Sequence, residues 1–170
     1  DIRLAFLRST KMSRVDFRGT KLELADLSFS MIEDVNFSKA DLKRADLNEV
    51  VIKRSKLDGV DMSKARLRKI HIRNSTIIES NLNDVNMYQA NISSTSMRYS
   101  TLRKANLIGS DLSKTNLQNV DLKNANLYKA FLIETDFKFA LMVEADLQLQ
   151  DIKRSEFSGS SVGNANYKSI

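Results

Sequence analysis

The chain contains no cysteine, no proline and no tryptophan, and only one histidine among its 170 residues. Without cysteine it cannot form disulfide bonds, use a thiol nucleophile or build a cysteine-based metal site. The single histidine, His71, stands near Arg73, and no Ser/His/Asp or metal-ligand motif accompanies it. We therefore predict that the protein is not an enzyme, and we assign it no catalytic residue, no metal ligand and no cofactor.

Long apolar runs and a secretory leader are also missing from the sequence. No stretch approaches the roughly 18 apolar residues that a membrane-spanning helix requires. The sequence opens at Asp1, already inside a repeat, so we expect residues 1–170 to form a single domain that is a segment of a longer chain. The missing targeting signals favour a cytoplasmic location, with a secreted effector as the alternative.

A five-residue repeat runs through the whole chain. Every fifth residue from Ile2 to Tyr167 is apolar, which makes 34 such positions, called centres below. The residue two before each centre, called the small position, is Ala, Ser, Thr or Val except at Ile70, Gln150 and Ile170. All 27 basic and 21 acidic residues occupy the other three positions. Two positions of each repeat therefore face a core, and three face solvent.

Only one type of backbone accommodates this pattern. In an α-helix, five residues advance by about 500°, so the apolar stripe would drift by about 140° with each repeat. In a continuous strand, a period of two would send alternate repeats to opposite faces. A short strand followed by a turn keeps the small position and the centre on one inward face. Repetition of this unit predicts a solenoid whose coils stack through backbone hydrogen bonds.

Phenylalanine and glycine indicate how many residues make up one coil. Four of the eight phenylalanines occupy centres, and these four are separated by multiples of 20 residues. Three of the five glycines likewise share one position modulo 20, as expected of a repeated tight corner. These residues are Phe17, Phe37, Phe137 and Phe157, and Gly19, Gly59 and Gly159. Four repeats per coil follow, with aromatic rings stacked on one face and glycines aligned on one edge.

The repeat resembles that of the pentapeptide-repeat proteins, whose signature is A-(D/N)-L-x-x. Asp or Asn precedes 19 of the 34 centres, and the resemblance covers the whole chain. Matching segments are Ala25-Asp26-Leu27, Ala40-Asp41-Leu42, Ala45-Asp46-Leu47, Ala105-Asn106-Leu107, Ala125-Asn126-Leu127 and Ala145-Asp146-Leu147. The resemblance implies an all-β fold, a right-handed quadrilateral parallel β-helix of about 8.5 coils with about 20 residues each.

Apolar residues at outward positions suggest a surface for a protein partner. Tyr88, Ile108 and Tyr128 are spaced by 20 residues and should stack on one face. Other outward apolar residues follow along the chain. The full set of predicted partner-binding residues is Tyr88, Ile108, Tyr128, Phe131, Ile133, Phe139, Leu141, Val143 and Leu149. An exposed apolar patch is typical of an interface. The alternative is that these residues pack on one another or on a cap outside this segment.

Basic residues concentrate between residues 41 and 74, which carry a net charge of +5 out of +6 for the chain. The predicted site for an anion or an acidic partner, called the basic band, consists of Lys43, Arg44, Lys53, Arg54, Lys64, Arg66, Arg68, Lys69 and Arg73. Stacking should place Lys53 beside Arg73 and Arg44 beside Lys64. The alternative interpretation is a solvated surface with interspersed acids, and the aromatic residues of a single-strand nucleic-acid platform are missing.

Three functions are compatible with the sequence, and the first is the leading hypothesis. It is a non-enzymatic scaffold for protein–protein interaction, a rigid rod that docks a protein partner through surface ladders of side chains. The family resemblance implies an alternative, a DNA mimic that inhibits type II topoisomerase and protects it from quinolones. Such rods are acidic, often carry loops and dimerise through a C-terminal helix, whereas this chain is basic and has no loop insertion.

The third function is binding of nucleic acid or an anionic membrane through the basic band. We also expect that the chain can form a homo-oligomer by end-to-end or face packing. Both ends of the predicted solenoid are in mid-register without a polar or helical cap, and open coil ends present unpaired edges.

Overall fold

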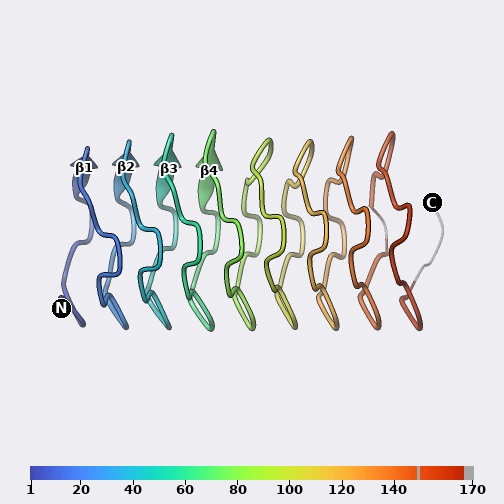
Figure 1. Ribbon diagram of the computed structural model, residues 1–170, viewed down its shortest axis with the longest axis horizontal. Coiled ribbons are helices and arrows are strands. Elements are labelled where there is room, and N and C mark those ends of the chain that lie inside the picture. Colours follow the sequence, from blue (N-terminus) through green and yellow to red (C-terminus); the bar gives the residue numbers. More distant parts are fainter. Residues whose placement is uncertain (149, 167–170) are drawn as a thin grey trace.

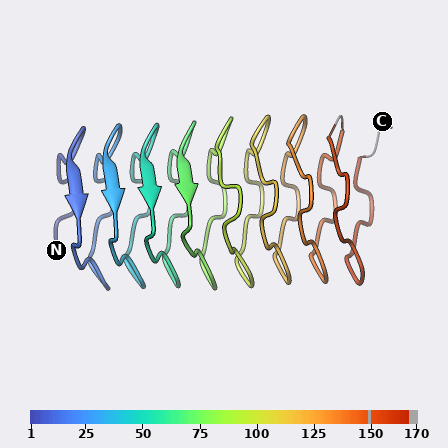
Figure 2. The ribbon, with the colours of Figure 1, turned by 90° about the horizontal axis from the view of Figure 1, so that it is seen from above.

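The computed structural model describes residues 1–148 and 150–166. The chain winds into a rod of stacked coils that follow one another along the rod in sequence order (Figure 1), and the view from above shows the same stacking (Figure 2). Four strands lie side by side on one face. They are β1 (Lys11–Ser13), β2 (Met31–Glu33), β3 (Val51–Lys53) and β4 (His71–Arg73), and they form a parallel sheet in the order β1-β2-β3-β4.

Stacked positions are separated by 20 residues on every face. In the sheet, Lys11 lies opposite Met31 and Ile52 lies opposite Ile72. Isolated parallel bridges on the other faces keep the same spacing, as between Asp146 and Asn166. The prediction of four five-residue repeats per coil is therefore confirmed by the pairing of the backbone.

The rod has four faces, which we number by the centres that they carry. Face 1 carries Ile2, Leu22 and every twentieth residue after them; face 2 carries Leu7 and Leu27; face 3 carries Met12 and Ile32; face 4 carries Phe17 and Phe37. Strands β1–β4 belong to face 3. Each outward residue therefore stands in a column with residues 20 positions away.

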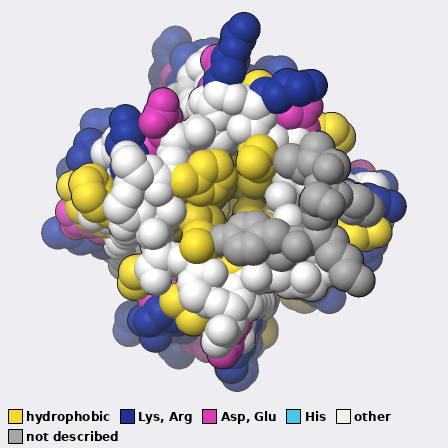
Figure 3. Space-filling view, turned by 90° about the vertical axis from the view of Figure 1, so that its right-hand side faces the viewer, with side chains coloured by type: hydrophobic (Ala, Val, Ile, Leu, Met, Phe, Trp, Pro, Cys, Tyr) yellow, Lys and Arg dark blue, Asp and Glu magenta, His cyan; other side chains and the backbone are white. Residues whose placement is uncertain are grey.

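The interior is one continuous column of apolar side chains. Centres and small positions from Leu22 to Leu147 are buried, and the centre side chains fill the space that the small residues leave. The rings of Phe17 and Phe37 stack with centroids 5.1 Å apart, and those of Phe137 and Phe157 stack with centroids 5.0 Å apart. The prediction of aromatic rings on one face is confirmed. Viewed from the C-terminal end, apolar side chains occupy the middle of the rod and charged ones its rim (Figure 3).

The corners of the coils share one backbone feature. The second residue after every described centre has a positive φ, between 48° and 70°. Gly19, Gly59 and Gly159 all take this position on face 4, so their alignment on one edge is confirmed. A β-turn with a positive φ at its third residue favours glycine, yet 28 other residues adopt it here. The stacked coils, rather than glycine, therefore impose the corner geometry.

Candidate interaction surfaces

A repeated side-chain hydrogen bond explains the Asp and Asn residues that precede the centres. From Asp1 to Asp151, Oδ1 of each such residue accepts the backbone N–H of the residue two positions later, as between Asn126 and Tyr128 at 3.0 Å. This N–H takes no part in the backbone ladder between turns, so the side chain satisfies a free donor. These carboxylates and amides thus shape the corners and hold the outward columns in line.

The structure brings Tyr88, Ile108 and Tyr128 together as one column on face 2. All three side chains are half-buried, because each packs along its neighbours in the column. Cations flank the column at both ends: the Arg68 guanidinium carbon lies 5.5 Å from the centroid of the Tyr88 ring, and Lys129 Nζ lies 5.0 Å from that of Tyr128. We call Tyr88, Ile108 and Tyr128 the tyrosine column. Its geometry matches the stacking predicted from the 20-residue spacing.

The other predicted apolar residues do not join the tyrosine column. Phe131 and Ile133 lie on face 3, Phe139 on face 4, and Leu141 and Val143 on face 1. Leu149 lies outside the described residues. Phe139 is 60% exposed and its ring covers Gly159, where an added Cβ would come within 2.5 Å of the ring. The eight described residues thus form one column and separate small groups, not one continuous patch.

The basic band is spread over faces 1, 2 and 3 instead of forming one patch, and acids neutralise part of it. Lys43 lies 3.3 Å from Asp41 and 3.5 Å from Asp61, and the hydrogen bond to Asp41, with the nearby Asp61 charge, raises the pKa of Lys43. The Arg66 guanidinium lies 2.7 Å from Asp46. Exposed pairs of this kind contribute little to stability, about 0–1 kcal/mol each, but they remove these cations from any ligand site.

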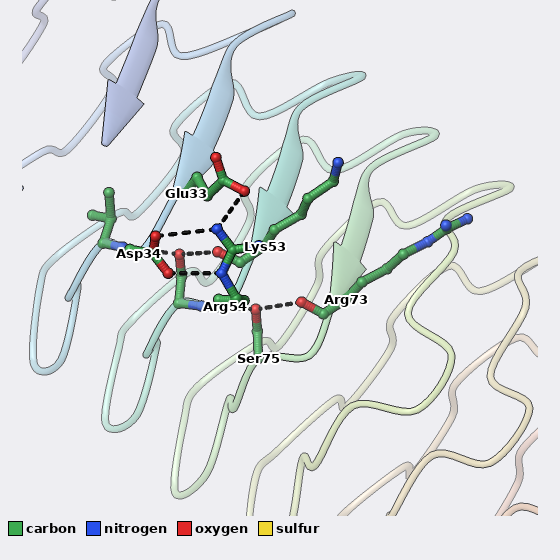
Figure 4. Close-up of polar contacts among 8 residues, drawn as sticks. Glu33, Asp34, Lys53, Arg54, Arg73 and Ser75 are labelled. Atoms are coloured by element: carbon green, nitrogen blue, oxygen red, sulfur yellow. Dashed lines mark hydrogen bonds and ion pairs between the residues drawn. The ribbon is translucent and has the colours of Figure 1, made fainter. Parts of the chain in front are cut away.

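Arg54 illustrates the same neutralisation on face 3. Its guanidinium lies 2.9 Å from Asp34 and 2.5 Å from Glu33, one coil below, and this contact lowers the pKa of Asp34 (Figure 4). The remaining members of the basic band form no ion pair with any residue that the structure describes. They are Arg44 and Lys64 on face 1, Arg68 and Lys69 on face 2, and Lys53 and Arg73 on face 3. Lys53 and Arg73 are paired neighbours in β3 and β4, as predicted.

Further exposed apolar residues were not singled out from the sequence. They are Leu4, Phe6, Leu24, Phe29, Met31 and Tyr99, each between 44% and 90% exposed. Phe6 and Met31 directly precede centres, a position that Asp or Asn usually occupies. An apolar residue there could have predicted their exposure from the sequence. Met31 lines a groove across β1–β3, a feature that the repeat pattern does not encode.

The described residues offer no arrangement for metal binding. Among residues 1–148 and 150–166, no three or more His, Asp or Glu side chains gather as ligands. His71 is exposed in the column between Val51 and Asn91 on face 3. In the same described part of the chain, no helix has the length and hydrophobicity needed to cross a bilayer.

The stacked parallel coils and outward columns define a β-helical repeat protein. Residues 50–127 match the family model described as a pentapeptide repeat region, and the same repeat continues in register on both sides of that segment. Residues 50–127 therefore form a pentapeptide repeat region. The fold predicted from the sequence, a right-handed quadrilateral parallel β-helix, is thereby confirmed.

Solved structures show the same fold at low sequence identity. The full-length plasmid-mediated fluoroquinolone resistance protein QnrB1 is 16% identical with a TM-score of 0.64, and the match covers 92% of each chain. HetL from Nostoc sp. strain PCC 7120, a pentapeptide repeat protein involved in heterocyst differentiation regulation, is 22% identical with a TM-score of 0.52, covering 97% of this chain and 88% of HetL. At these identities the likeness concerns the fold alone. A search of curated protein sequences gave no match.

Proposed function

We propose that the chain is a non-enzymatic scaffold that docks a protein partner through the tyrosine column on face 2. The observation that carries this proposal is that two tyrosines and an isoleucine align at the position directly after a centre. Most residues at this position elsewhere in the chain are polar. Tyrosine supplies a large apolar ring with a polar hydroxyl, which is why interfaces are enriched in it.

The surroundings of the tyrosine column also suit docking. The backbone N–H groups of all three residues are held by Asn86, Asn106 and Asn126, so the column is rigid before a partner arrives. A preorganised surface loses little conformational entropy on binding. Cations at both ends, on Arg68 and Lys129, would favour carboxylates on the rim of the partner's surface.

Mimicry of DNA is a weaker proposal for this chain. A DNA mimic must present a dense array of negative charge, whereas this chain carries a net charge of +6. The acidic residues that precede the centres are also engaged in corner hydrogen bonds, as Asp26 is with the N–H of Ser28 at 2.9 Å. We therefore keep the protein-docking proposal as the function to test.

The test compares partner capture by the wild type and two variants in a lysate of the source organism, followed by mass spectrometry. Tyr88→Ser with Tyr128→Ser removes the tyrosine column, and we expect it to lose a partner that the wild type retains at high salt. Tyr99→Ser is the matched control, since Tyr99 is 49% exposed on face 4 and also contacts an arginine. Equal capture by all three proteins, with melting temperatures unchanged, would contradict the proposal.

A further inference from the structure

The sheet face formed by β1–β4 carries a groove along the rod axis. One part, with a volume of about 310 Å³, lies over β1–β3 and is lined by Met31, Val51 and Lys53 among others. A second part of about 260 Å³ lies over β3 and β4, between Val51, Lys53, His71 and Arg73. Because the two parts share Val51 and Lys53, they form one continuous groove.

Over β2 and β3, the groove contains an apolar pair beside the charged side chains of Glu33 and Lys53. Met31 is 49% exposed and Val51 is half-buried, and the two are paired neighbours in adjacent strands. Both precede centres, the position at which Asp or Asn would hold the corner. An exposed methionine there adds neither a corner hydrogen bond nor core packing. The fold therefore does not explain this apolar pair.

The groove is cationic over β3 and β4. Lys53 and Arg73 are paired neighbours, and neither forms an ion pair within the described part of the chain. Figure 4 shows both side chains extending away from the cluster in which Arg54 neutralises Glu33 and Asp34. Two stacked cations repel each other, so an anion between them would stabilise the arrangement.

We infer that this groove binds an extended acidic peptide segment of a protein partner. An apolar side chain of the segment lies over Met31 and Val51, and a carboxylate lies between Lys53 and Arg73, within reach of His71. The Met31–Val51 pair and the Lys53–Arg73 pair are offset by one coil, about 5 Å along the rod at ~4.8 Å per coil, and an extended peptide spans this distance with one or two residues. The inference rests on the proposed scaffold function and adds a second site with a partner chemistry.

The distribution of charge favours a peptide over a polyanion. A nucleic acid or a lipid surface needs cations along its whole contact. Here Lys11 lines the groove over β1 and Lys53 and Arg73 line it over β3 and β4, while Met31, Val51 and the acidic Glu33 interrupt the cations between them. The prominent aromatic residues that would enter a bilayer, such as Phe6 and Phe29, lie on the corners of face 2 and not in the groove.

The test is a selection of random dodecamer peptides displayed on phage against the immobilised full chain. We expect enriched peptides to carry an apolar residue with Asp or Glu one or two positions away. Binding of a synthetic copy should weaken by about tenfold or more in Lys53→Glu with Arg73→Glu, since a charge-assisted contact becomes repulsive. Met31→Gln should reduce the apolar preference while leaving the acidic one.

The matched control is Arg44→Glu with Lys64→Glu, which reverses two cations stacked on face 1 by the same 20-residue spacing. The inference is supported if the control variant still binds the synthetic peptide and the Lys53→Glu, Arg73→Glu variant does not. The inference is overturned if the selected peptides share no acidic and apolar pattern, or if both variants lose peptide binding equally. It is also overturned if the groove binds anionic vesicles or duplex DNA but no peptide. Loss of the captured partner in the tyrosine variant alone would leave the proposed function standing and reject the groove as its second site.

Discussion

Face 3 turns its corner in two different ways along the rod. In the coils of β1–β4, the backbone N–H groups of Val35 and Ser55 are donated to Oγ of Ser55 and Ser75 in the next coil, both at 3.1 Å. In later coils, the N–H groups of Thr115 and Thr135 are donated to the carbonyl of the centre three residues earlier, at 3.0 and 3.2 Å, which closes a β-turn, and the Thr135 N–H also lies 3.2 Å from Ser155 Oγ in the next coil. The first arrangement leaves the chain extended as strands, and the second makes it turn.

The hydroxyl groups at the small position account for this difference. Ser75 Oγ donates to the carbonyl of Arg73 in its own coil at 2.9 Å, so it can accept an N–H from the coil before. Thr115 Oγ1 instead donates to the carbonyl of Ile92 in the preceding coil at 3.0 Å. On face 3, Ser55 and Ser75 at the wide corners donate within their own coil, whereas Thr115 and Thr135 at the tight corners donate to the preceding coil. The groove lies only over the wide corners.

The largest expected loss of stability comes from truncating the apolar core, which lies beneath both the wide and the tight corners of face 3. Ile72→Ala in β4 and Leu112→Ala in a later coil each empty a fully buried position of the same column. Both should lower the free energy of unfolding by about 2–5 kcal/mol, because each leaves a cavity in a core that packs alike beneath both corners. Urea unfolding measures this. A much smaller loss for Ile72→Ala would show that the core differs beneath the sheet.

An intermediate effect should separate the two corners. Ser75→Ala removes the acceptor of the buried Ser55 N–H and should cost about 1–3 kcal/mol, whereas Thr115→Val removes one hydroxyl bond and should cost about 0.5–1.5 kcal/mol. In Thr115→Val, the N–H of residue 115 still donates to the carbonyl of Leu112, so the turn is kept. Amide hydrogen exchange should show faster exchange at Ser55 in the first variant only. Unchanged protection at Ser55 would contradict the account of the wide corner.

The smallest effect concerns the carboxylates that hold tight corners. The hydrogen bond from the Ser28 hydroxyl, with the Ser28 N–H and nearby arginines, lowers the pKa of Asp26 against the opposing effect of burial. A lowered folded-state pKa contributes stability above the unfolded-state value of about 3.9, and this contribution is lost as the pH falls through the folded-state pKa. Asp26→Asn keeps an acceptor for the N–H but does not titrate.

We therefore expect the melting temperatures of the wild type and of Asp26→Asn to differ by a constant amount at neutral pH. Below about pH 4 the wild type should lose stability faster than the variant, because only its carboxylate is protonated. A matched variant on the wide corner, Met31→Asn, changes no titrating group and should leave the acid dependence as in the wild type. An identical acid dependence in Asp26→Asn would contradict the role assigned to this carboxylate.

The sequence predicted the fold because its signals are local and repeat with every coil. Apolar centres, small positions and the spacing of Phe17 and Phe37 specify the inward side chains and the 20-residue coil without knowledge of any distant contact. The tyrosine column follows from the same arithmetic. The two corner types do not, because they depend on whether the hydroxyl of a residue such as Ser75 donates within its coil or to the preceding one.

The candidate sites were predicted less completely than the fold. The basic band was identified as a set, but charge along the sequence could not tell that Arg54 is neutralised while Lys53 and Arg73 are not. The groove was missed because it arises between columns on a flat sheet, and hydropathy alone treats Met31 as one more outward residue. The repeat predicts which side chains stand next to one another. It does not predict which of them form ion pairs or where the surface is hollowed.

The axial direction of the hydrogen bonds also has a mechanical consequence. Because each coil is bonded only to the coils 20 residues before and after it, tension between the two ends loads the bonds of one interface at a time. The rod should then peel coil by coil, each step releasing about 60–70 Å of extended chain. Such a rod would yield to tension in equal increments and could recoil from any remaining coil.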